Sequence, residues 1–296
     1  MEISGSPCYI GGIAGPVGDG SIIRNCYTIG NIDVSGKGNN YAGGITSYLS
    51  GSNIIIQNCH TSSNVSTFGS GSFNYVGGIT SYLYGSSIII QNCYTTGNIT
   101  SSGSNLFRSY AGGIIGYMNG NEVDSGIVKD CYTTGDVASS GALSMNYAGG
   151  IAGVTRNSIR NCYTTGNIRT SGSAGGVTGR TESTGNIRNC VALNNAITTS
   201  GENRDRHRIG LIQGDVILTG NYGSTTIVAT PVGIWVSDVN GKDGADCSAR
   251  PTESWWRNSN NWHTEAGTSA WDFTDIWQWD SVSGLPKLRN MANSLN

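Results

Sequence analysis

The sequence predicts an all-β protein, a parallel β-helix (β-solenoid) of about seven coils that ends in a tryptophan-rich C-terminal cap. Three observations lead to this prediction. An Asn-Cys motif returns six times, a Gly-Gly motif returns in step with it, and 45 glycines stand beside only 12% charged residues in a chain of 296 residues. Because glycine costs about 1 kcal/mol at each helix position, this composition is not typical of a helical protein.

The first motif recurs with a slightly elastic period of 28 to 38 residues, and the second motif runs in step with it. The first motif has the form "IRNCYTTGN", as at Ile159, and the second has the form "GGIAG", as at Gly11. The cysteines of the first motif are Cys26, Cys59, Cys93, Cys131, Cys162 and Cys190, and the second motif starts at Gly11, Gly43, Gly77, Gly112, Gly149 and Gly175. Two motifs with a common period indicate stacked units of one shape.

Each unit is expected to supply about three short β-segments, namely the "GGI", "IxNCYT" and "GNI" stretches, with turns rich in Gly, Ser and Asn between them. A seventh, degenerate coil begins with "RIGLIQG" at Arg208. Coils stacked about 4.8 Å apart would form a rod of roughly 30 Å, and the usual hand of parallel β connections predicts a right-handed helix.

The Asn-Cys motif predicts a corner of each coil. Side chains alternate along a strand, so the Ile and the Cys, three positions apart, both face inward only if the Asn between them lies at a bend. Asparagine tolerates the left-handed backbone conformation that such a bend needs. We therefore expect amide-to-amide hydrogen bonds between stacked asparagines, interrupted by Asp130; the members are Asn25, Asn58, Asn92, Asn161 and Asn189.

The cysteines of this ladder are expected to be buried, reduced thiols. Neighbouring coils bring equivalent Cα atoms within disulfide range, but in-register side chains point the same way and keep their Cβ atoms too far apart. A linear file of single cysteines also lacks the tetrahedral ligand group that zinc needs, so we predict no metal and no cofactor. Cys8 and Cys247 lie off the ladder, and the sequence leaves their state open.

The composition changes near residue 231, because all seven tryptophans lie beyond it. We therefore divide the chain into a repeat solenoid, residues 1–230, and a C-terminal capping region, residues 231–296. A solenoid leaves the apolar face and the strand edges of its last coil exposed, so a cap is the preferred role for these tryptophans. An aromatic sugar-binding platform is the alternative.

The "GGIAG…IRNCYTTGNI" unit resembles the GLUG repeat, which occurs in large secreted or surface-attached bacterial proteins, including adhesin-like proteins and some immunoglobulin-A-cleaving peptidases. The resemblance covers roughly residues 8 to 230 and implies a solenoid scaffold and a secreted or cell-surface location, but no particular ligand. Ser47 and Ser81 replace the glycine that closes the Gly-Gly motif of the family. The chain starts almost at once with repeat-like sequence and shows neither a signal nor an anchor, so we expect it to be part of something longer.

Catalytic chemistry is not indicated. No acidic residue lies between Asp33 and Glu122, so coils two and three offer no carboxylate pair of the kind that glycosidases use. Asp130 and Asp136 occupy positions that other repeats fill with Asn, which predicts turn roles. His263 in "HTEAG" lacks the second histidine of a zinc peptidase helix. We therefore predict a protein that is not an enzyme.

Charge and hydropathy exclude two further classes of partner. The formal net charge of -2 gives no basic field for nucleic acid, and no apolar run approaches the roughly 20 residues of a membrane span. The charged run "ENRDRHR", residues 202–208, is expected to be a solvated loop.

Two outward files beside the Asn-Cys corner form the tentative ligand-binding surface. The tyrosine file comprises Tyr27, Tyr94, Tyr132 and Tyr163, with His60 in the second coil, and the polar file contains Arg24 and Arg160 with Gln57, Gln91, Lys129 and Arg188. Aromatic rings could stack on sugars while the polar file donates hydrogen bonds, although aromatic ladders also stabilise stacked coils by themselves. A further ladder, Tyr41, Tyr75, Tyr110 and Tyr147, precedes the Gly-Gly motif and has the same two interpretations.

These observations favour a non-enzymatic adhesin or stalk module that binds glycans or proteins of a host or a neighbouring cell. The first alternative is a fibre subunit that stacks its coils end to end with other copies. Ice binding and polysaccharide degradation are less favoured.

Overall fold

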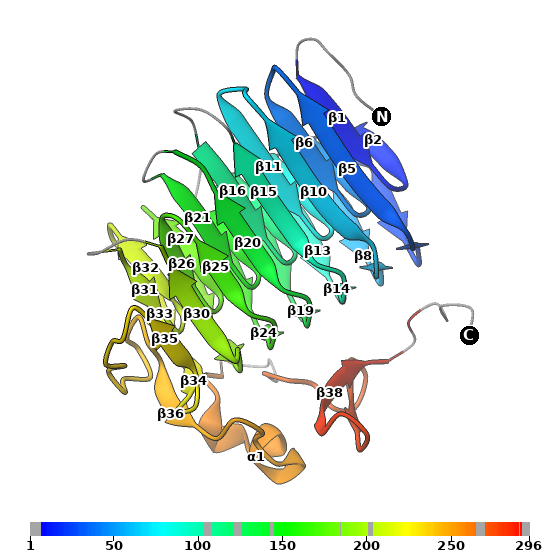
Figure 1. Ribbon diagram of the computed structural model, residues 1–296. Coiled ribbons are helices and arrows are strands. Elements are labelled where there is room, and N and C mark those ends of the chain that lie inside the picture. Colours follow the sequence, from blue (N-terminus) through cyan, green and yellow to red (C-terminus); the bar gives the residue numbers. More distant parts are fainter. Residues whose placement is uncertain are drawn as a thin grey trace.

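The computed structural model describes residues 7–103, 108–120, 126–142, 145–183, 185–200, 204–264, 270–289 and 291. Parallel strands from successive coils stack into five sheets, which we name S1 to S5 in the order in which the chain enters them (Figure 1). In the described part of the chain, S1, S2, S3 and S5 have seven strands each and S4 has eight. The predicted all-β parallel solenoid is thereby confirmed.

The strands of each sheet follow one another along the stack. S1 contains β1 (Cys8–Gly11), β6 (Asn40–Gly43), β11 (Phe73–Gly77), β16 (Arg108–Gly112), β21 (Asn146–Gly149), β26 (Ser173–Gly175) and β31 (Arg206–His207). S2 contains β2 (Ala14–Val17), β7 (Thr46–Ser52), β12 (Thr80–Ser86), β17 (Ile115–Gly120), β22 (Ala152–Thr155), β27 (Thr178–Glu182) and β32 (Gly210–Gln213). S3 contains β3 (Ile22–Arg24), β8 (Ile55–Gln57), β13 (Ile88–Gln91), β18 (Gly126–Lys129), β23 (Ser158–Arg160), β28 (Asn186–Arg188) and β33 (Ile217–Thr219).

The last two sheets complete each coil. S4 contains β4 (Tyr27–Thr28), β9 (His60–Thr61), β14 (Tyr94–Thr95), β19 (Tyr132–Thr133), β24 (Tyr163–Thr164), β29 (Val191–Ala192), β34 (Tyr222–Ser224) and β36 (Ala245–Cys247). S5 contains β5 (Asn31–Gly36), β10 (Asn64–Gly69), β15 (Ile99–Gly103), β20 (Val137–Ser140), β25 (Ile168–Thr170), β30 (Ala196–Thr199) and β35 (Val228–Thr230). The C-terminal region adds α1 (Glu253–Arg257), the 3-10 turn η1 (Ser259–Asn261) and the antiparallel hairpin of β37 (Trp277–Asp280) and β38 (Leu285–Leu288).

A coil therefore has five strands where the sequence predicted about three segments. The Gly-Gly pair separates S1 from S2, and the Asn-Cys bend separates S3 from S4. A Cβ atom on Gly43 would collide with the carbonyl oxygen of Thr46, so the first glycine permits a sharp corner. A Cβ atom on Gly44 would lie 2.8 Å from the methyl group of Thr61, so the second glycine lets a buried S4 threonine approach across the core.

The predicted asparagine corner is confirmed. The backbone φ angle is 54° at Asn25 and Asn58, 53° at Asn92 and 53° at Asp130, all in the left-handed region. Asn58 donates to Asn25 Oδ1 at 3.1 Å, and Asn92 donates to Asn58 Oδ1 at 3.2 Å. Asn161 donates to Asp130 Oδ1 at 3.1 Å. An ionised Asp130 has no N–H to donate onward to Asn92, which is the predicted interruption.

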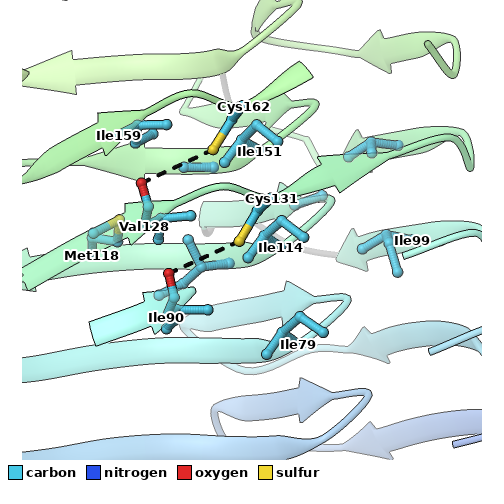
Figure 2. Close-up of a cluster of buried hydrophobic side chains, with 14 of the residues drawn as sticks. Ile79, Ile90, Ile99, Ile114, Met118, Val128, Cys131, Ile151, Ile159 and Cys162 are labelled. Carbon is cyan, nitrogen blue, oxygen red and sulfur yellow. Dashed lines mark hydrogen bonds between the residues drawn. The ribbon is translucent and has the colours of Figure 1, made fainter. Parts of the chain in front are cut away.

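The ladder cysteines are free thiols at the edge of the core, and they are buried as predicted except for Cys26 of the first coil, which is half-buried. Cys131 and Cys162 are fully buried, and the thiol of each donates to the carbonyl oxygen two residues earlier at 3.1 Å. Figure 2 shows that each also faces a carbonyl of the preceding coil, Ile90 for Cys131 and Val128 for Cys162. Burial raises the pKa of Cys162 far above its ordinary value. Cys8 and Cys247, which lie off the ladder, are also buried.

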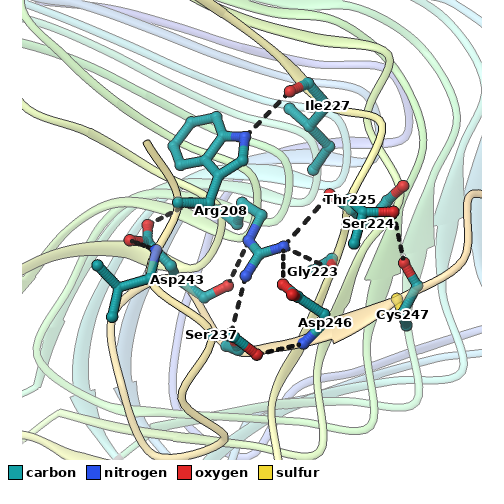
Figure 3. A network of polar contacts seen from close by, with 12 residues as sticks. Arg208, Gly223, Ser224, Thr225, Ile227, Ser237, Asp243, Asp246 and Cys247 are labelled. Atoms are coloured by element: carbon teal, nitrogen blue, oxygen red, sulfur yellow. Dashed lines mark hydrogen bonds and ion pairs between the residues drawn. The ribbon is translucent and has the colours of Figure 1, made fainter. Parts of the chain in front are cut away.

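The run "ENRDRHR" corrects a sequence expectation. Residues 201–203 lie outside the described residues, but Arg208 is completely buried and does not belong to a solvated loop. Its guanidinium donates to the carbonyl oxygens of Gly223, Asp243 and Gly244 at 2.8 to 3.0 Å, and it pairs with Asp246 at 2.8 Å (Figure 3). The side chain thus ties the last coil to the segment that follows residue 231.

The C-terminal region covers the solenoid in two places. Trp235 packs against the core at its end, and its indole donates to the carbonyl oxygen of Ile227 at 3.0 Å. Beyond β36, the chain turns back along the outside of S4 (Figure 1). There Trp256, Trp271 and Trp277 form a buried aromatic cluster. A boundary near residue 231 stays a prediction, and β36 continues sheet S4 past it.

Candidate binding surfaces

The predicted tyrosine file is a continuous stack of rings on the outside of S4. Tyr27 and His60 lie 5.3 Å apart between ring centroids, His60 and Tyr94 lie 4.6 Å apart, and Tyr132 follows at 4.9 Å. Adjacent rings in this stack are within 9° of parallel. Stacked rings at this separation stabilise neighbouring strands, which is the structural role that the sequence left open.

The C-terminal half of this file is not free surface. Tyr163 is 2% exposed, its ring lies 6.1 Å from that of Trp277, and its hydroxyl donates to the carbonyl oxygen of Pro286 at 2.7 Å. Tyr132 is also in contact with Trp277. The expectation that Tyr163 faces solvent was therefore wrong, because the file offers apolar rings on which the tryptophans bury themselves. Tyr27 and Tyr94 remain half-buried.

The predicted polar file is continuous in register but divides into two environments. Arg24 is exposed in the first coil, four strands of S3 away from Arg160. Three basic residues of the later coils, Lys129, Arg160 and Arg188, line a cavity of about 270 Å³. The opposite wall of this cavity comes from the C-terminal region and includes His263, Asp272 and Ile276. Arg160 and Arg188 each have an interaction partner. Arg24 and Arg160 therefore do not form one site.

The ladder before the Gly-Gly motif is one of two tyrosine columns that meet at the S1–S2 corner. The first column is Tyr41, Tyr75, Tyr110 and Tyr147, whose exposed fractions are 6 to 9%. The second column is Tyr48, Tyr82 and Tyr117 on S2, and these rings are half-buried. Rings of the two columns meet edge to face, for example Tyr75 with Tyr82 at 5.1 Å. Burial raises the pKa of Tyr48 to about 12, so the phenols stay neutral and can donate hydrogen bonds.

The outer face of S2 changes from aromatic to charged along the stack. Register pairs Tyr82 with Tyr117, Tyr117 with Val154, and Val154 with Arg180. Arg156 and Arg180 both form ion pairs with Glu182, with N–O distances of 3.0 and 2.9 Å. Each guanidinium also lies over a tyrosine ring, Arg156 at 6.0 Å from the centroid of Tyr117 and Arg180 at 5.3 Å from that of Tyr147. We call this surface the S2 face; its members are Tyr48, Tyr82, Tyr117, Arg156, Arg180 and Glu182.

Sequence reasoning missed the S2 column although a signal was present. Tyr48, Tyr82 and Tyr117 each lie five residues after the first glycine of the Gly-Gly motif. The same offset gives Val154 and Arg180 in the next two coils. Aligning the repeats on the glycines would therefore have shown both the column and its change from aromatic to basic.

The described residues contain no group of three or more His, Cys, Asp or Glu side chains that could hold a metal ion. Asp136 has the predicted turn role, because its Oδ1 accepts from the backbone N–H of Asn167 at 2.7 Å. Burial raises the pKa of Asp130, which lies in the asparagine ladder.

In the parts of the chain that the structure describes, no helix is long and apolar enough to cross a membrane.

Comparison with known proteins finds a similarity of fold to a solved structure. A solved structure described as a putative immunoglobulin A1 protease from Bacteroides ovatus matches with a TM-score of 0.54 and 20% sequence identity, over 91% of this chain and 86% of that chain. At this identity the likeness shows the fold alone. No protein-family model matches the chain, and no curated protein matches it significantly.

Proposed function

We propose that this chain is a non-enzymatic β-solenoid module of a secreted or cell-surface bacterial protein, and that it acts as an adhesin or stalk that binds glycans. The S2 face is the observation that supports this proposal most strongly. It presents half-buried tyrosine rings at the spacing of β-strands, followed by guanidinium and amide groups. The GLUG-like repeat favours the same location and role.

Physical chemistry explains why such a face suits a sugar. The apolar side of a sugar ring packs on an aromatic ring, and its hydroxyl groups need partners that both donate and accept hydrogen bonds. Asn119 supplies such a partner beside the tyrosines, because its amide donates to Tyr82 Oη at 3.0 Å and its oxygen accepts from Arg156 at 2.9 Å. A stacked solenoid holds these groups in place before a ligand arrives, which lowers the entropic cost of binding.

A glycan array with the purified chain and two variants tests the proposal. Tyr82→Ala removes a ring of the S2 face, and Tyr94→Ala removes a half-buried ring of the S4 file as a matched control. We expect binding by the parent chain, at least tenfold weaker binding by Tyr82→Ala and little change for Tyr94→Ala, with the circular dichroism of all three alike. If Tyr94→Ala alone loses binding, the S4 file is the site, and if no glycan binds, the glycan-binding role is wrong.

Two other functions each have a specific observation in their favour, and the purified chain can be used to test both. The first coil exposes Ile13, Ile22 and Ile29 at 48, 54 and 64%, which favours end-to-end association, although Trp235 covers the other end. Sedimentation that depends on concentration would support a fibre subunit. The name of the structural neighbour suggests a protease, and cleavage of immunoglobulin A1 by the purified chain would overturn the non-enzymatic role.

A further inference from the structure

Among the described residues, the charged end of the S2 face carries a net positive charge. Glu182 is one carboxylate between two guanidinium groups, paired with Arg156 at 3.0 Å and with Arg180 at 2.9 Å. The other described partners of these two arginines are neutral, namely Asn119, Tyr147 and Gln213. One positive charge is therefore left over in a chain whose formal net charge is -2. This positive charge lies next to the tyrosines of the S2 face.

Arg156 keeps donors for a ligand. A guanidinium has five N–H groups, and the described contacts of Arg156 use its Nε and its Nη1. Its side chain is 40% exposed, against 22% for Arg180. The contacts with Glu182 and with the ring of Tyr117 hold Arg156 in position, so little side-chain entropy remains to be lost when an anion binds.

The distance between the aromatic and the charged ends defines the size of a ligand. Tyr82, Tyr117, Val154 and Arg180 occupy the same register position on four successive strands. Strands lie about 4.8 Å apart, so Tyr82 and Arg180 are separated by about 14 Å. A molecule that touches both ends must be longer than a single sugar ring. Its aromatic-facing part is neutral and its other end is anionic.

We propose that the S2 face binds acidic oligosaccharides, with a carboxylate of one sugar unit on Arg156 and Arg180 and the adjoining sugar units packed against Tyr117 and Tyr82. This inference rests on the proposed glycan-binding function and names its ligand class. A carboxylate matches the planar donor pair of a guanidinium in a bidentate geometry, which makes it a better fit than a hydroxyl group. Glu182 orients the two arginines and repels a second anion, so one carboxylate binds in this cluster.

The test compares each of a set of carboxylated oligosaccharides with its own carboxyl-reduced form by titration calorimetry, at low and moderate salt. The parent chain is expected to bind the carboxylated form about tenfold more tightly. Arg156→Gln keeps a polar side chain but removes the charge, and it is expected to abolish this preference by weakening the binding of the carboxylated form much more than that of the reduced form. Arg169→Gln, an exposed arginine on S5, is the matched control and should keep the preference.

The outcomes separate this inference from the proposed function. Binding of reduced and carboxylated forms with equal affinity overturns the acidic ligand class and leaves glycan binding intact. Absence of binding to every glycan overturns both. If Arg156→Gln loses affinity equally for the carboxylated and the reduced form and its thermal midpoint changes, then Arg156 has a structural role and the carboxylate contact is refuted. Tighter binding of sulfated than of carboxylated sugars refutes the bidentate carboxylate geometry.

Discussion

Replacing Arg208 with Met should loosen the C-terminal end of the solenoid. Arg208 is fully buried, and it satisfies the carbonyl oxygens of Gly223, Asp243 and Gly244 between the last coil and the chain that follows it. Methionine fills a similar volume without any donor. The substitution therefore removes the hydrogen bonds while it leaves the packing almost unchanged.

The expected loss of stability follows from these contacts. A hydrogen bond from a charged donor contributes about 1.5 to 3 kcal/mol, and removing one partner of a buried polar pair typically costs about 3 to 5 kcal/mol. The carboxylate side chain of Asp246 is 50% exposed, so water can solvate it once Arg208 is gone. The ion pair thus adds little, and the stranded carbonyls set the cost at about 3 kcal/mol.

Urea unfolding followed by tryptophan fluorescence measures this loss, because Trp235 lies at the same end of the stack. Asp246→Asn is the matched control, since it removes the ion pair and keeps the carbonyl contacts of Arg208. We expect the control to cost less than Arg208→Met, because the side-chain oxygen of Asn can still accept from Arg208 at this half-exposed position. A loss below about 1 kcal/mol in Arg208→Met, or equal losses in both variants, would refute the assignment of the stability to the carbonyl contacts.

Two further predictions concern the corners of the coil. Gly113→Ala places a methyl group 2.5 Å from that of Thr133 and against the backbone of Gly150, so it should lower the free energy of unfolding by about 1 to 3 kcal/mol. Gly15→Ala is the control, because its methyl group would lie in open space and should change the stability little. The midpoints of urea unfolding compare the two variants. Burial raises the pKa of Asp130, so the folded state binds its proton more readily than the unfolded chain, and stability falls as the pH rises from 3.8 through the raised value. Asp130→Asn should therefore add about 1 kcal/mol at pH 7 and lose this gain below about pH 4, which thermal midpoints across that range would reveal; an unchanged difference at every pH would contradict it.

The candidate site was predicted only in part. The tyrosine file of S4 followed from the repeat, because one offset from the cysteine gives the same residue type in successive coils. Its partial burial could not be predicted, since Trp277 lies far from Tyr132 and Tyr163 in the sequence and meets them only after the chain has turned back. Likewise, the enclosure of Arg160 in a cavity could not be predicted, because the opposite wall comes from His263 and Asp272 of the C-terminal region.

The sequence by itself determined the periodic part of this protein. Asn at the left-handed bend, glycine where a side chain would collide, and cysteine just inside the corner are local requirements that recur in each coil, so they leave a repeating signal. Tertiary structure decided the parts that occur once. Arg208 looks like one charge in a charged run until Gly223 and Gly244 surround it, and the S2 face exists only because stacking places residues from successive coils about 4.8 Å apart. Non-periodic contacts between distant segments have no counterpart in the sequence pattern, because their energy arises from packing partners that the local sequence does not contain.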